Sequence, residues 1–467
     1  MSDAIVKNLS NSSQINWEDV LITKEFQACL QFEDLKELSL VSKLLRSKLK
    51  PKLFSNIVLN GKLFDPCFIN GKNLIYEYFE FFRYIMSWNS IEEYEDSHCK
   101  ELEVEPAYKE FEDQILGFKH LVKSFNLTEL GSAGYYLLPL ANSFSNLNTL
   151  KILNCTVSLS GFNDLLSSKD KLTSIELTYT NFTKLPTEKL KLEDVKFPKT
   201  LTNLYVYECH LGENELITNP YDFLFDKVYS GTTNDFILPS TSIPSLKNLS
   251  FLAPYYNDSG LNEFLGANNQ LEFLHFKSSS LDQVKIDHFQ KSKTLKKLEI
   301  VCESEMFNEV NIPTLSSIEE IEIQYLRPKV FTTIKDLCLS SPNLKKLNII
   351  FDTYDDFANM VNRLLSDVIA NSHNLKELTL WIFGDFEGAI DLKKLNNIEV
   401  LNIHANLVTL LNIEFNKSNS LKRVNLGYNE TDTDLDAIKE KFNMIQDWKF
   451  EISEGSIEGV NLKYITK

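Results

Sequence analysis

A repeated pattern of leucines constrains the fold of this chain more than any other feature of the sequence. Each copy has apolar residues at its first, fourth and sixth positions and a small or polar residue at its ninth, as in Leu147, Leu150, Ile152 and Cys155. The copies begin at Val122, Leu147, Leu172, Leu201, Leu246, Leu271, Leu295, Ile318, Leu344, Leu375, Ile398 and Leu421. The intervals between successive starts are 25, 25, 29, 45, 25, 24, 23, 26, 31, 23 and 23 residues. Such regular recurrence predicts a stack of similar units rather than one compact core.

The spacing within each copy predicts its local structure. The apolar residues at the fourth and sixth positions alternate, so they point to the same side of a short strand. The ninth residue, an Asn, Cys or Thr, can satisfy backbone groups in the following turn, where an unpaired group would be unfavourable. Helical stretches lie between strands, the longest at residues 357–368. One strand and one helix every ~25 residues is typical of leucine-rich repeats. We therefore predict an α/β fold in which residues 118–467 form a curved, right-handed leucine-rich-repeat solenoid.

The interval of 45 residues between Leu201 and Leu246 is the exception to this period. It is nearly two repeats long, so residues 225–228 could belong to a degenerate repeat within it. An insertion between two ordinary repeats is the alternative.

The residues between the leucines of each strand are expected to face outward on the concave side, where a ligand would bind. Their charges balance: Lys151, Lys277, Lys297, Lys346 and Arg423 are basic, and Glu176, Glu299, Glu320, Glu322 and Glu377 are acidic. A neutral face that carries aromatic groups suits a protein ligand, because aromatic residues dominate binding energies at protein interfaces. The candidates for binding a protein substrate are Tyr205, Tyr207, Phe273, His275, Trp381 and His404. The alternative is that they are ordinary surface residues.

Ahead of the repeats, the sequence predicts a helix over residues 33–49, with Pro51 as its stop. At 100° per residue its apolar side chains make two stripes. One stripe holds Leu35, Leu38, Val41, Leu45 and Leu49, and Leu40 and Leu44 fall roughly opposite. A helix that is apolar on two sides must be covered on two sides. The second side therefore needs either the rest of the chain or a partner.

Residues 34–59, DLKELSLVSKLLRSKLKPKLFSNIVL, resemble the second half of a fungal F-box. The stretch VKSFNL at residues 122–127 resembles the first repeat of fungal F-box/leucine-rich-repeat proteins. Order and spacing agree along most of the chain. The sequence departs from the family at residues 17–20, where the Leu-Pro pair that usually opens an F-box is absent.

The resemblance implies a substrate-recognition subunit of a cullin-RING ubiquitin ligase. In that family the F-box docks on the small adaptor protein of the ligase, and the repeats hold a protein substrate for ubiquitination. Adaptor contacts would fall on Leu35, Leu38, Val41, Ser42, Leu45, Pro51, Leu53 and Phe54, to which the second apolar stripe adds Leu40 and Leu44. The alternative is a repeat scaffold outside any ligase, in which the F-box-like segment only caps the first repeat.

These features divide the chain into four parts. Residues 1–16 are expected to be a disordered N-terminus, and residues 17–60 a small all-helical F-box-like domain. Residues 61–117 are expected to form a helical connector, which is aromatic at 74–88 and acidic at 92–113. Residues 118–467 then form the repeat domain.

Composition and missing motifs disfavour several classes of function. The net charge of −17 disfavours nucleic acid as a partner, because binding phosphates depends on clustered Lys and Arg. No apolar run approaches the ~20 residues that cross a membrane. The seven cysteines include no CxxC pair, which suits reduced thiols in the cytoplasm or nucleus. No phosphate loop, zinc-ligand spacing or nucleophile elbow appears, so we expect neither a cofactor nor enzymatic activity.

Overall fold

The computed structural model describes residues 20–21, 23–61, 109, 112–113, 115–131, 133–184, 189–191, 194–213, 232–253, 259–277, 279, 281–302, 310–351, 357–383, 392, 395–413, 415, 420–428 and 435–464. The chain forms two compact units, residues 1–156 with 219–227 and residues 157–218 with 228–467. Several predicted segments lie outside the described residues: the N-terminal tail, the aromatic run at 74–88, nearly all of the acidic stretch at 92–113 and the degenerate repeat at 225–228. The domain boundaries at residues 60 and 117 stay predictions.

The first unit combines three short helices with the start of a parallel ladder. The helices are α2 (Lys24–Ala28), α3 (Phe32–Val41) and α4 (Lys43–Leu53). Strand β1 (Asn56–Asn60) pairs in parallel with β2 (Ser124–Gly131), which pairs in parallel with β3 (Thr149–Ser158). The 3-10 helix η5 (Lys119–Leu121) precedes β2, and α7 (Gly134–Leu137) and the 3-10 helix η6 (Leu138–Ser143) lie between β2 and β3.

Strand β1 is a repeat strand that the sequence prediction assigns to the helical domain. Ile57 and Leu59 stand opposite Phe125 and Leu127 of β2 in the ladder. Phe54, Ile57 and Leu59 also have the first, fourth and sixth spacing of the repeat. The ladder therefore begins one strand earlier than predicted, directly after α4.

The second unit is a parallel ladder of ten repeat strands. They are β4 (Ser174–Thr178), β6 (Asn203–Tyr207), β9 (Asn248–Leu252), β10 (Phe273–Lys277), β11 (Lys297–Val301), β12 (Glu320–Leu326), β13 (Lys346–Phe351), β14 (Glu377–Trp381), β15 (Val400–His404) and β16 (Arg423–Gly427). Each coincides with a predicted repeat, which confirms the leucine-rich-repeat ladder in this unit. The register slips only within the pairing of β12 with β13, between Ile323 and Leu326.

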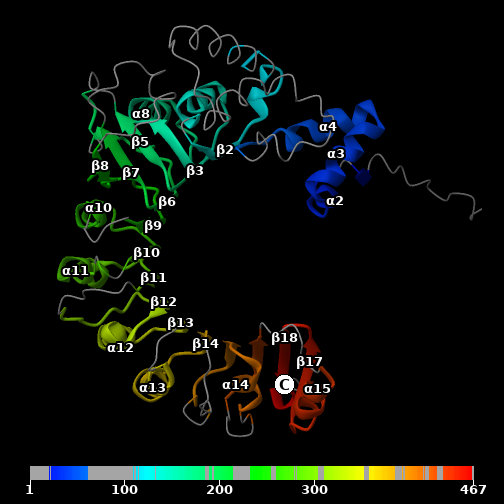
Figure 1. Cartoon of the computed structure of the whole chain (residues 1–467), viewed down its shortest axis with the longest axis vertical. Coiled ribbons are helices and arrows are strands. Elements are labelled where there is room, and N and C mark those ends of the chain that lie inside the picture. Colours follow the sequence, from blue (N-terminus) through cyan, green and yellow to red (C-terminus); the bar gives the residue numbers. More distant parts are fainter. Residues whose placement is uncertain are drawn as a thin grey trace, which may run out of the picture. The chain divides into compact units, whose positions relative to one another are not determined.

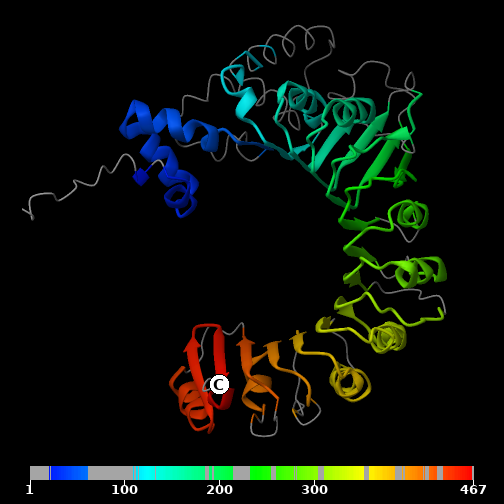
Figure 2. The same ribbon diagram turned by 180° about the vertical axis from the view of Figure 1, so that it is seen from behind.

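Helices cover one side of this ladder. They are α8 (Leu159–Ser168), α10 (Leu261–Ala267), α11 (Gln283–Lys291), α12 (Phe331–Leu339), α13 (Phe357–Arg363), α14 (Leu407–Leu411) and α15 (Leu435–Asn443), with short π and 3-10 turns after α13 (Leu364–Val368 and Ile369–Asn371) and a 3-10 turn before α12 (Pro328–Val330). From α10 to α13 the helices lie on the outer side of the stacked strands (Figure 1). The strands form the inner side, as the view from behind also shows (Figure 2).

The long interval between Leu201 and Leu246 contributes two strands to a small second sheet. Strand β5 (Asn181–Lys184) pairs in parallel with β7 (His210–Glu213), and β7 pairs antiparallel with β8 (Thr232–Asp235). Strands β7 and β8 lie within the interval, so part of it forms this sheet and does not form another repeat strand.

The inward residues of the ladder form one continuous core. Leu204, Leu249, Leu274 and Leu298 come from successive strands, stand opposite one another in register, and are buried. Burying each such side chain contributes roughly 1.5–3 kcal/mol. A single repeat could not bury its own inward side chains, so neighbouring repeats stabilise one another.

In two repeats the ninth residue bonds to the backbone carbonyl two residues before it, in line with the prediction that it satisfies backbone groups. The Cys155 thiol donates to the carbonyl of Leu153 at 3.2 Å, and the Cys209 thiol donates to the carbonyl of Tyr207 at 3.5 Å. Burial raises the pKa of both thiols to about 12, so they stay protonated at neutral pH. The cysteines in the described part of the chain are free thiols: Cys29, Cys155, Cys209, Cys302 and Cys338.

The C-terminal end differs from the prediction that repeats continue to residue 467. Strands β17 (Trp448–Ser453) and β18 (Ser456–Asn461) form an antiparallel hairpin, followed by a short 3-10 turn (Leu462–Tyr464), and β18 pairs antiparallel with β16. The hairpin covers the last repeat strand and places Phe450 against the rings of Phe415, Phe442 and Trp448. It is a cap built from different secondary structure, in which β18 pairs with the edge of β16 that would otherwise be open.

Candidate protein-binding surfaces

The hairpin of α3 and α4 is the first candidate surface. The sequence predicts one helix over residues 33–49 that stops before Pro51, and the structure contradicts this. It has a break at Ser42 and places Pro51 inside α4. Ser42 is extended (φ −147°, ψ 157°), and its hydroxyl accepts a hydrogen bond from the backbone N–H of Leu45 at 3.1 Å. A serine N-cap of this kind begins a new helix, so the two apolar stripes do not belong to one continuous helix.

One face of the hairpin forms its own small core. Leu35, Leu45 and Leu49 are buried, and Leu21, Leu30, Leu38 and Leu53 pack against them half-buried. Of the residues predicted to contact an adaptor, Leu35 and Leu45 are therefore part of the fold. Leu38 and Leu53 offer only part of their surface to a partner.

The other face exposes large apolar side chains. Leu40, Val41 and Leu44 have exposed fractions of 68%, 72% and 43%, and Phe32 has 56%. The sequence left open whether the rest of the chain or a partner covers the stripe of Leu40 and Leu44, and both side chains are exposed in the structure. Val41 falls on the same predicted stripe as Leu35, Leu45 and Leu49, but it is exposed whereas those three are buried. Contiguous exposed apolar residues mark interaction sites more often than isolated ones do.

Pro51 and Phe54 lie at the end of α4 nearest the ladder. Pro51 is exposed. The Phe54 ring stacks on Phe118 with 4.5 Å between ring centroids. The next residue, Ser55, accepts hydrogen bonds through its carbonyl from the backbone N–H groups of Lys123 and Ser124, at 2.8 and 2.9 Å. Phe54 therefore contributes to joining the hairpin to the first strands.

The second candidate surface is the strand face, defined as the outward residues of β4 to β16 in the second unit. The predicted alternation is present, because in β4, β6, β11, β14 and β15 half-buried outward residues alternate with buried ones. Strands β9 and β10 differ, since Ser250, Leu252, His275 and Lys277 are buried. His275, predicted to be exposed, is only 8% exposed.

Three tyrosines form a patch at the β4 and β6 end of the strand face. The Tyr179 and Tyr207 hydroxyl oxygens are hydrogen-bonded at 3.3 Å, and the two rings meet edge to face. This bond is the main reason that the pKa of Tyr207 lies above its usual value. Burial, helped by the carboxylates of Glu176 and Glu299, also raises the pKa of Tyr205. The phenols of Tyr205 and Tyr207 are therefore neutral at physiological pH.

At the opposite end of the strand face, Trp381 and His404 stack on each other. Their ring centroids are 3.7 Å apart and their planes differ by 9°. Gly427 stands beside His404 in the ladder. A Cβ at Gly427 would lie 2.3 Å from Nδ1 of His404, so the glycine leaves the space that the imidazole occupies. Phe383 extends this group, with its ring centroid 6.2 Å from that of Trp381.

The predicted substrate-binding residues do not form one cluster. Tyr205 and Tyr207 lie on β6, Phe273 and His275 on β10, and Trp381 and His404 on β14 and β15. Six strand-to-strand steps separate β6 from β14 along the ladder. At ~4.8 Å per step this is roughly 29 Å. Only a ligand that extends along several repeats could contact all of them.

The sequence pattern missed the residues that directly follow the strands. Tyr179 follows β4 and Glu208 follows β6, each with a positive φ value of 47°. The chain turns sharply there, and the side chains return to the strand face: Tyr179 contacts Tyr207, and Glu208 lies 3.5 Å from the Lys277 ammonium. Position in the repeat could have identified these residues, but their direction depends on the backbone turn.

The charged residues of the strand face are mostly paired between strands. The Lys297 ammonium lies 2.8 Å from Glu320 and 5.6 Å from the Phe273 ring centroid, and the Lys346 ammonium lies 3.0 Å from Glu377. Each such pair contributes only ~0–1 kcal/mol where solvent reaches it. The pairing nevertheless shows which charges on the strand face remain unpaired. A count of charges in the sequence could not show this.

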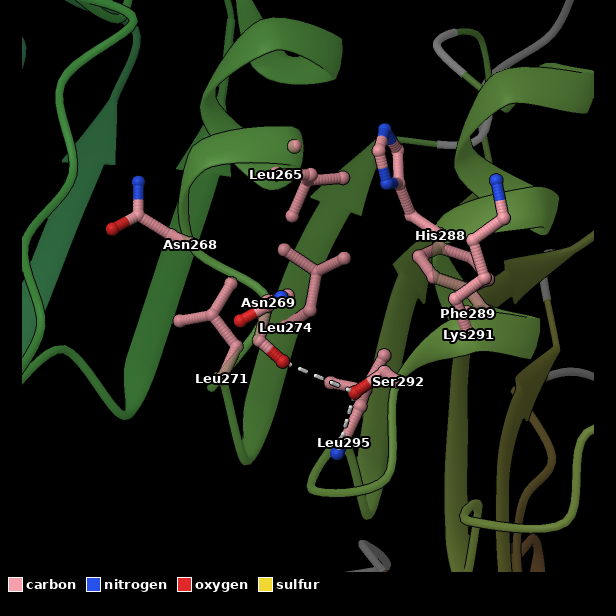
Figure 3. A pocket seen from close by; sticks show the side chains of 11 residues that line it. Leu265, Asn268, Asn269, Leu271, Leu274, His288, Phe289, Lys291, Ser292 and Leu295 are labelled. Carbon is pink, nitrogen blue, oxygen red and sulfur yellow. Dashed lines mark hydrogen bonds between the residues drawn. The ribbon is translucent and has the colours of Figure 1, made fainter.

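A hollow of about 220 Å³ opens between α10 and α11 over the inward side of β10 (Figure 3). Its lining comprises Leu265, Gly266, Asn268, Asn269, Leu271, Leu274, His288, Phe289, Lys291, Ser292 and Leu295. The Ser292 hydroxyl donates to the carbonyl of Asn269 at 3.5 Å and accepts from the backbone N–H of Leu295 at 3.1 Å. None of the predicted substrate-binding residues lies in this hollow.

Within the described part of the chain, no three His, Cys, Asp or Glu side chains are grouped as a metal would require. No described helix has the length and apolar character to cross a membrane.

Comparisons with known proteins give little beyond the geometry. No protein-family model matches the sequence, and no curated protein matches it. Among solved structures, an internalin from Listeria monocytogenes is similar over 65% of this chain and 74% of its own, with 17% sequence identity and a TM-score of 0.26. The repeat fold of this chain is therefore defined by its own strand ladder.

Proposed function

We propose that this protein is a substrate-recognition subunit of a cullin-RING ubiquitin ligase. Its helical hairpin would dock on the ligase adaptor, and its strand face would hold a protein substrate. The observation that carries the proposal is the exposure of Leu40, Val41 and Leu44 on a hairpin whose other face is already packed. The resemblance of residues 34–59 to an F-box supports the same assignment.

The energetics favour a partner on this face. Covering a large apolar side chain contributes roughly 1.5–3 kcal/mol, and a few such residues usually provide most of the affinity of an interface. The hairpin core made by Leu35, Leu45 and Leu49 gives these side chains a fixed support. A supported and uncovered apolar group is what a docking surface needs.

The strand face would supply the second half of the function. Its aromatic groups are spread over many strands, which suits an extended segment of a protein more than a small molecule. In this proposal the chain binds and positions the substrate, and other subunits of the ligase transfer ubiquitin. It would need no cofactor and would act in the cytoplasm or the nucleus.

A repeat scaffold outside any ligase is the second candidate, and one observation favours it. The residues after α4 enter the ladder directly, because β1 pairs with β2 and Phe54 stacks on Phe118. A segment built into the ladder in this way can serve as an N-terminal cap alone.

Binding of the full-length chain to the purified cullin adaptor separates the two functions. We expect the wild-type chain to bind, and we expect the double change Leu40→Glu with Leu44→Glu to weaken binding at least about a hundredfold, because two charges would be buried in an apolar contact. The affinities are to be measured by isothermal titration calorimetry.

The matched control is Leu339→Glu with Leu462→Glu. These leucines are 41% and 44% exposed and lie outside the hairpin, so the chemical change is the same. The control should bind the adaptor as the wild type does. A wild-type chain that does not bind the adaptor overturns the ligase function. Binding that survives Leu40→Glu with Leu44→Glu shows that the docking face lies elsewhere.

A further inference from the structure

Four polar side chains gather at the middle of the strand face. His275 on β10, Glu299 on β11 and Glu322 on β12 stand opposite one another in register. Gln324 joins the two carboxylates, because its Nε2 donates to Glu299 Oε1 at 2.6 Å and to Glu322 Oε1 at 3.1 Å. We call these four residues the acidic cluster. Its two glutamate side chains are 16% and 17% exposed, so solvent reaches them only in part.

The His275 ring points into the cluster with one nitrogen unsatisfied. Its Nδ1 lies 2.9 Å from the Ser250 hydroxyl, and its Nε2 lies 3.7 Å from Glu299 Oε1. The second distance is too long for a hydrogen bond. Among the residues that the structure describes, this buried Nε2 has no hydrogen-bond partner. Buried polar atoms are nearly always paired. When Nδ1 carries the ring proton and donates it to the Ser250 hydroxyl, Nε2 is an acceptor that lacks a donor.

The nearest lysine does not neutralise the cluster. The Lys297 ammonium lies 2.8 Å from Glu320 and 3.6 Å from Glu322 Oε2. It is therefore shared with a carboxylate outside the cluster. The predicted balance of charges holds for the strand face as a whole, but the ammonium nearest the cluster is shared between Glu320 and Glu322.

We propose that the acidic cluster is the subsite in which the strand face binds a cationic side chain, a lysine ammonium or an arginine guanidinium, of the substrate protein. Nε2 of His275 and the carboxylate oxygens of Glu299 and Glu322 accept hydrogen bonds, whereas ammonium and guanidinium groups only donate them. Tyr205 lies in the same register row, one strand beyond Ser250, and can pack against the apolar stem of such a side chain.

The electrostatics of the cluster agree with this assignment. Burial and the neighbouring Glu322 carboxylate raise the pKa of Glu299 to about 7. Near neutral pH, Glu299 therefore holds a proton about half of the time. A bound cation can replace that proton as the positive charge between the carboxyl groups.

The inference that the cationic side chain belongs to a substrate protein rests on the proposed function, but the test does not use the adaptor. The probe is a hexalysine peptide, acetylated at its N-terminus and amidated at its C-terminus, titrated into the full-length chain. We expect Glu299→Gln with Glu322→Gln to weaken binding about tenfold, in line with the loss of close charge pairs at other interfaces. Glutamine has nearly the same shape and can still accept from Gln324, and equal urea midpoints would show that the fold is kept.

The control is Glu263→Gln with Glu440→Gln, which removes two charges from the exposed faces of α10 and α15. It should stay within about twofold of the wild type, because those charges act only through the long-range field. Equal weakening in both double variants would mean that the peptide responds to net charge alone, and it would overturn the subsite. Unchanged binding in Glu299→Gln with Glu322→Gln would overturn it as well. Both outcomes leave adaptor binding untouched, so this inference can fail without the ligase function.

Discussion

We expect the free energy of unfolding to depend on pH in opposite directions in Glu299→Gln and His275→Gln. In the wild-type chain the contributions of Glu299 and His275 to this pH dependence should largely cancel. Burial is the main cause at both residues. It raises the pKa of Glu299 to about 7 and lowers the pKa of His275 to about 4. In an unfolded chain the corresponding values are about 4.3 and about 6.5. The folded chain thus holds the Glu299 proton more tightly and the His275 proton more weakly than the unfolded chain does.

The signs follow from proton linkage. The contribution of Glu299 to stability is fully present below about pH 4.3 and is lost as the pH rises through about 7. The contribution of His275 is present above about pH 6.5 and is lost as the pH falls through about 4. Between about pH 4.5 and 6.5, the slopes of unfolding free energy against pH that Glu299 and His275 contribute are similar in size and opposite in sign. They therefore largely cancel in the wild-type chain.

Each variant removes one slope and leaves the other. In Glu299→Gln, unfolding free energy should fall by up to about 3 kcal/mol relative to the wild type as the pH drops from 6.5 to 4.5. In His275→Gln, it should fall by up to about 3 kcal/mol as the pH rises from 4.5 to 7. The other charged groups that face the pair, Lys297, Glu320 and Glu322, are the same in both variants.

Urea denaturation at four pH values between 4.5 and 7.5 measures these slopes. Glu263→Gln on α10 is the control, and its curve should run parallel to that of the wild type. If the Glu299→Gln and His275→Gln curves also run parallel to the wild type, the two groups do not titrate abnormally in the folded chain. The acidic cluster would then be better hydrated than its burial indicates.

The ladder could be predicted from the sequence because its signal is local. Six residues hold one strand of the pattern, and the same six recur every ~25 residues. The prediction failed where the same pattern stood apart from the rest. Phe54, Ile57 and Leu59 have the repeat spacing, but the next copy begins 68 residues later, at Val122. Without a neighbour at the usual interval, the first strand looked like the end of a helical domain.

The details of the two surfaces depend on contacts that no local pattern contains. Continuing a helical stripe through Ser42 assumed an unbroken helix, and one hydroxyl bonded to the Leu45 amide was enough to break it. Counting charges on the strand face could not show that Lys297 pairs with Glu320, 23 residues away in sequence. The burial of His275 likewise depends on Ser250 and Glu299 from the two neighbouring strands.

The C-terminal hairpin depends on close packing around Gly459, which makes this position sensitive to any larger residue. Strand β18 lies between β16 and β17. A Cβ at Gly459 would lie 2.5 Å from a ring carbon of Phe450 and 2.6 Å from a methyl carbon of Val424. Val424 is fully buried in the ladder, and the Phe450 ring is held by Phe442 with 4.9 Å between centroids. Val424 has no free space to move into, and the half-buried Phe450 ring would have to leave its contact with Phe442.

We therefore expect Gly459→Val to destabilise the hairpin by about 3 kcal/mol, near the upper end for adding bulk to a packed site. Once the hairpin detaches, the edge of β16 and the side chain of Ile457 lose their cover, and the last repeats should fray. Hydrogen exchange of residues 448–461 measures the effect directly. Glu458→Val is the matched control, because it places the same side chain one residue away on the exposed side of β18. Exchange that is equally slow in both variants would show that the hairpin does not depend on the packing at Gly459, and the C-terminal cap would then have to be stabilised by the pairing of β18 with β16 alone.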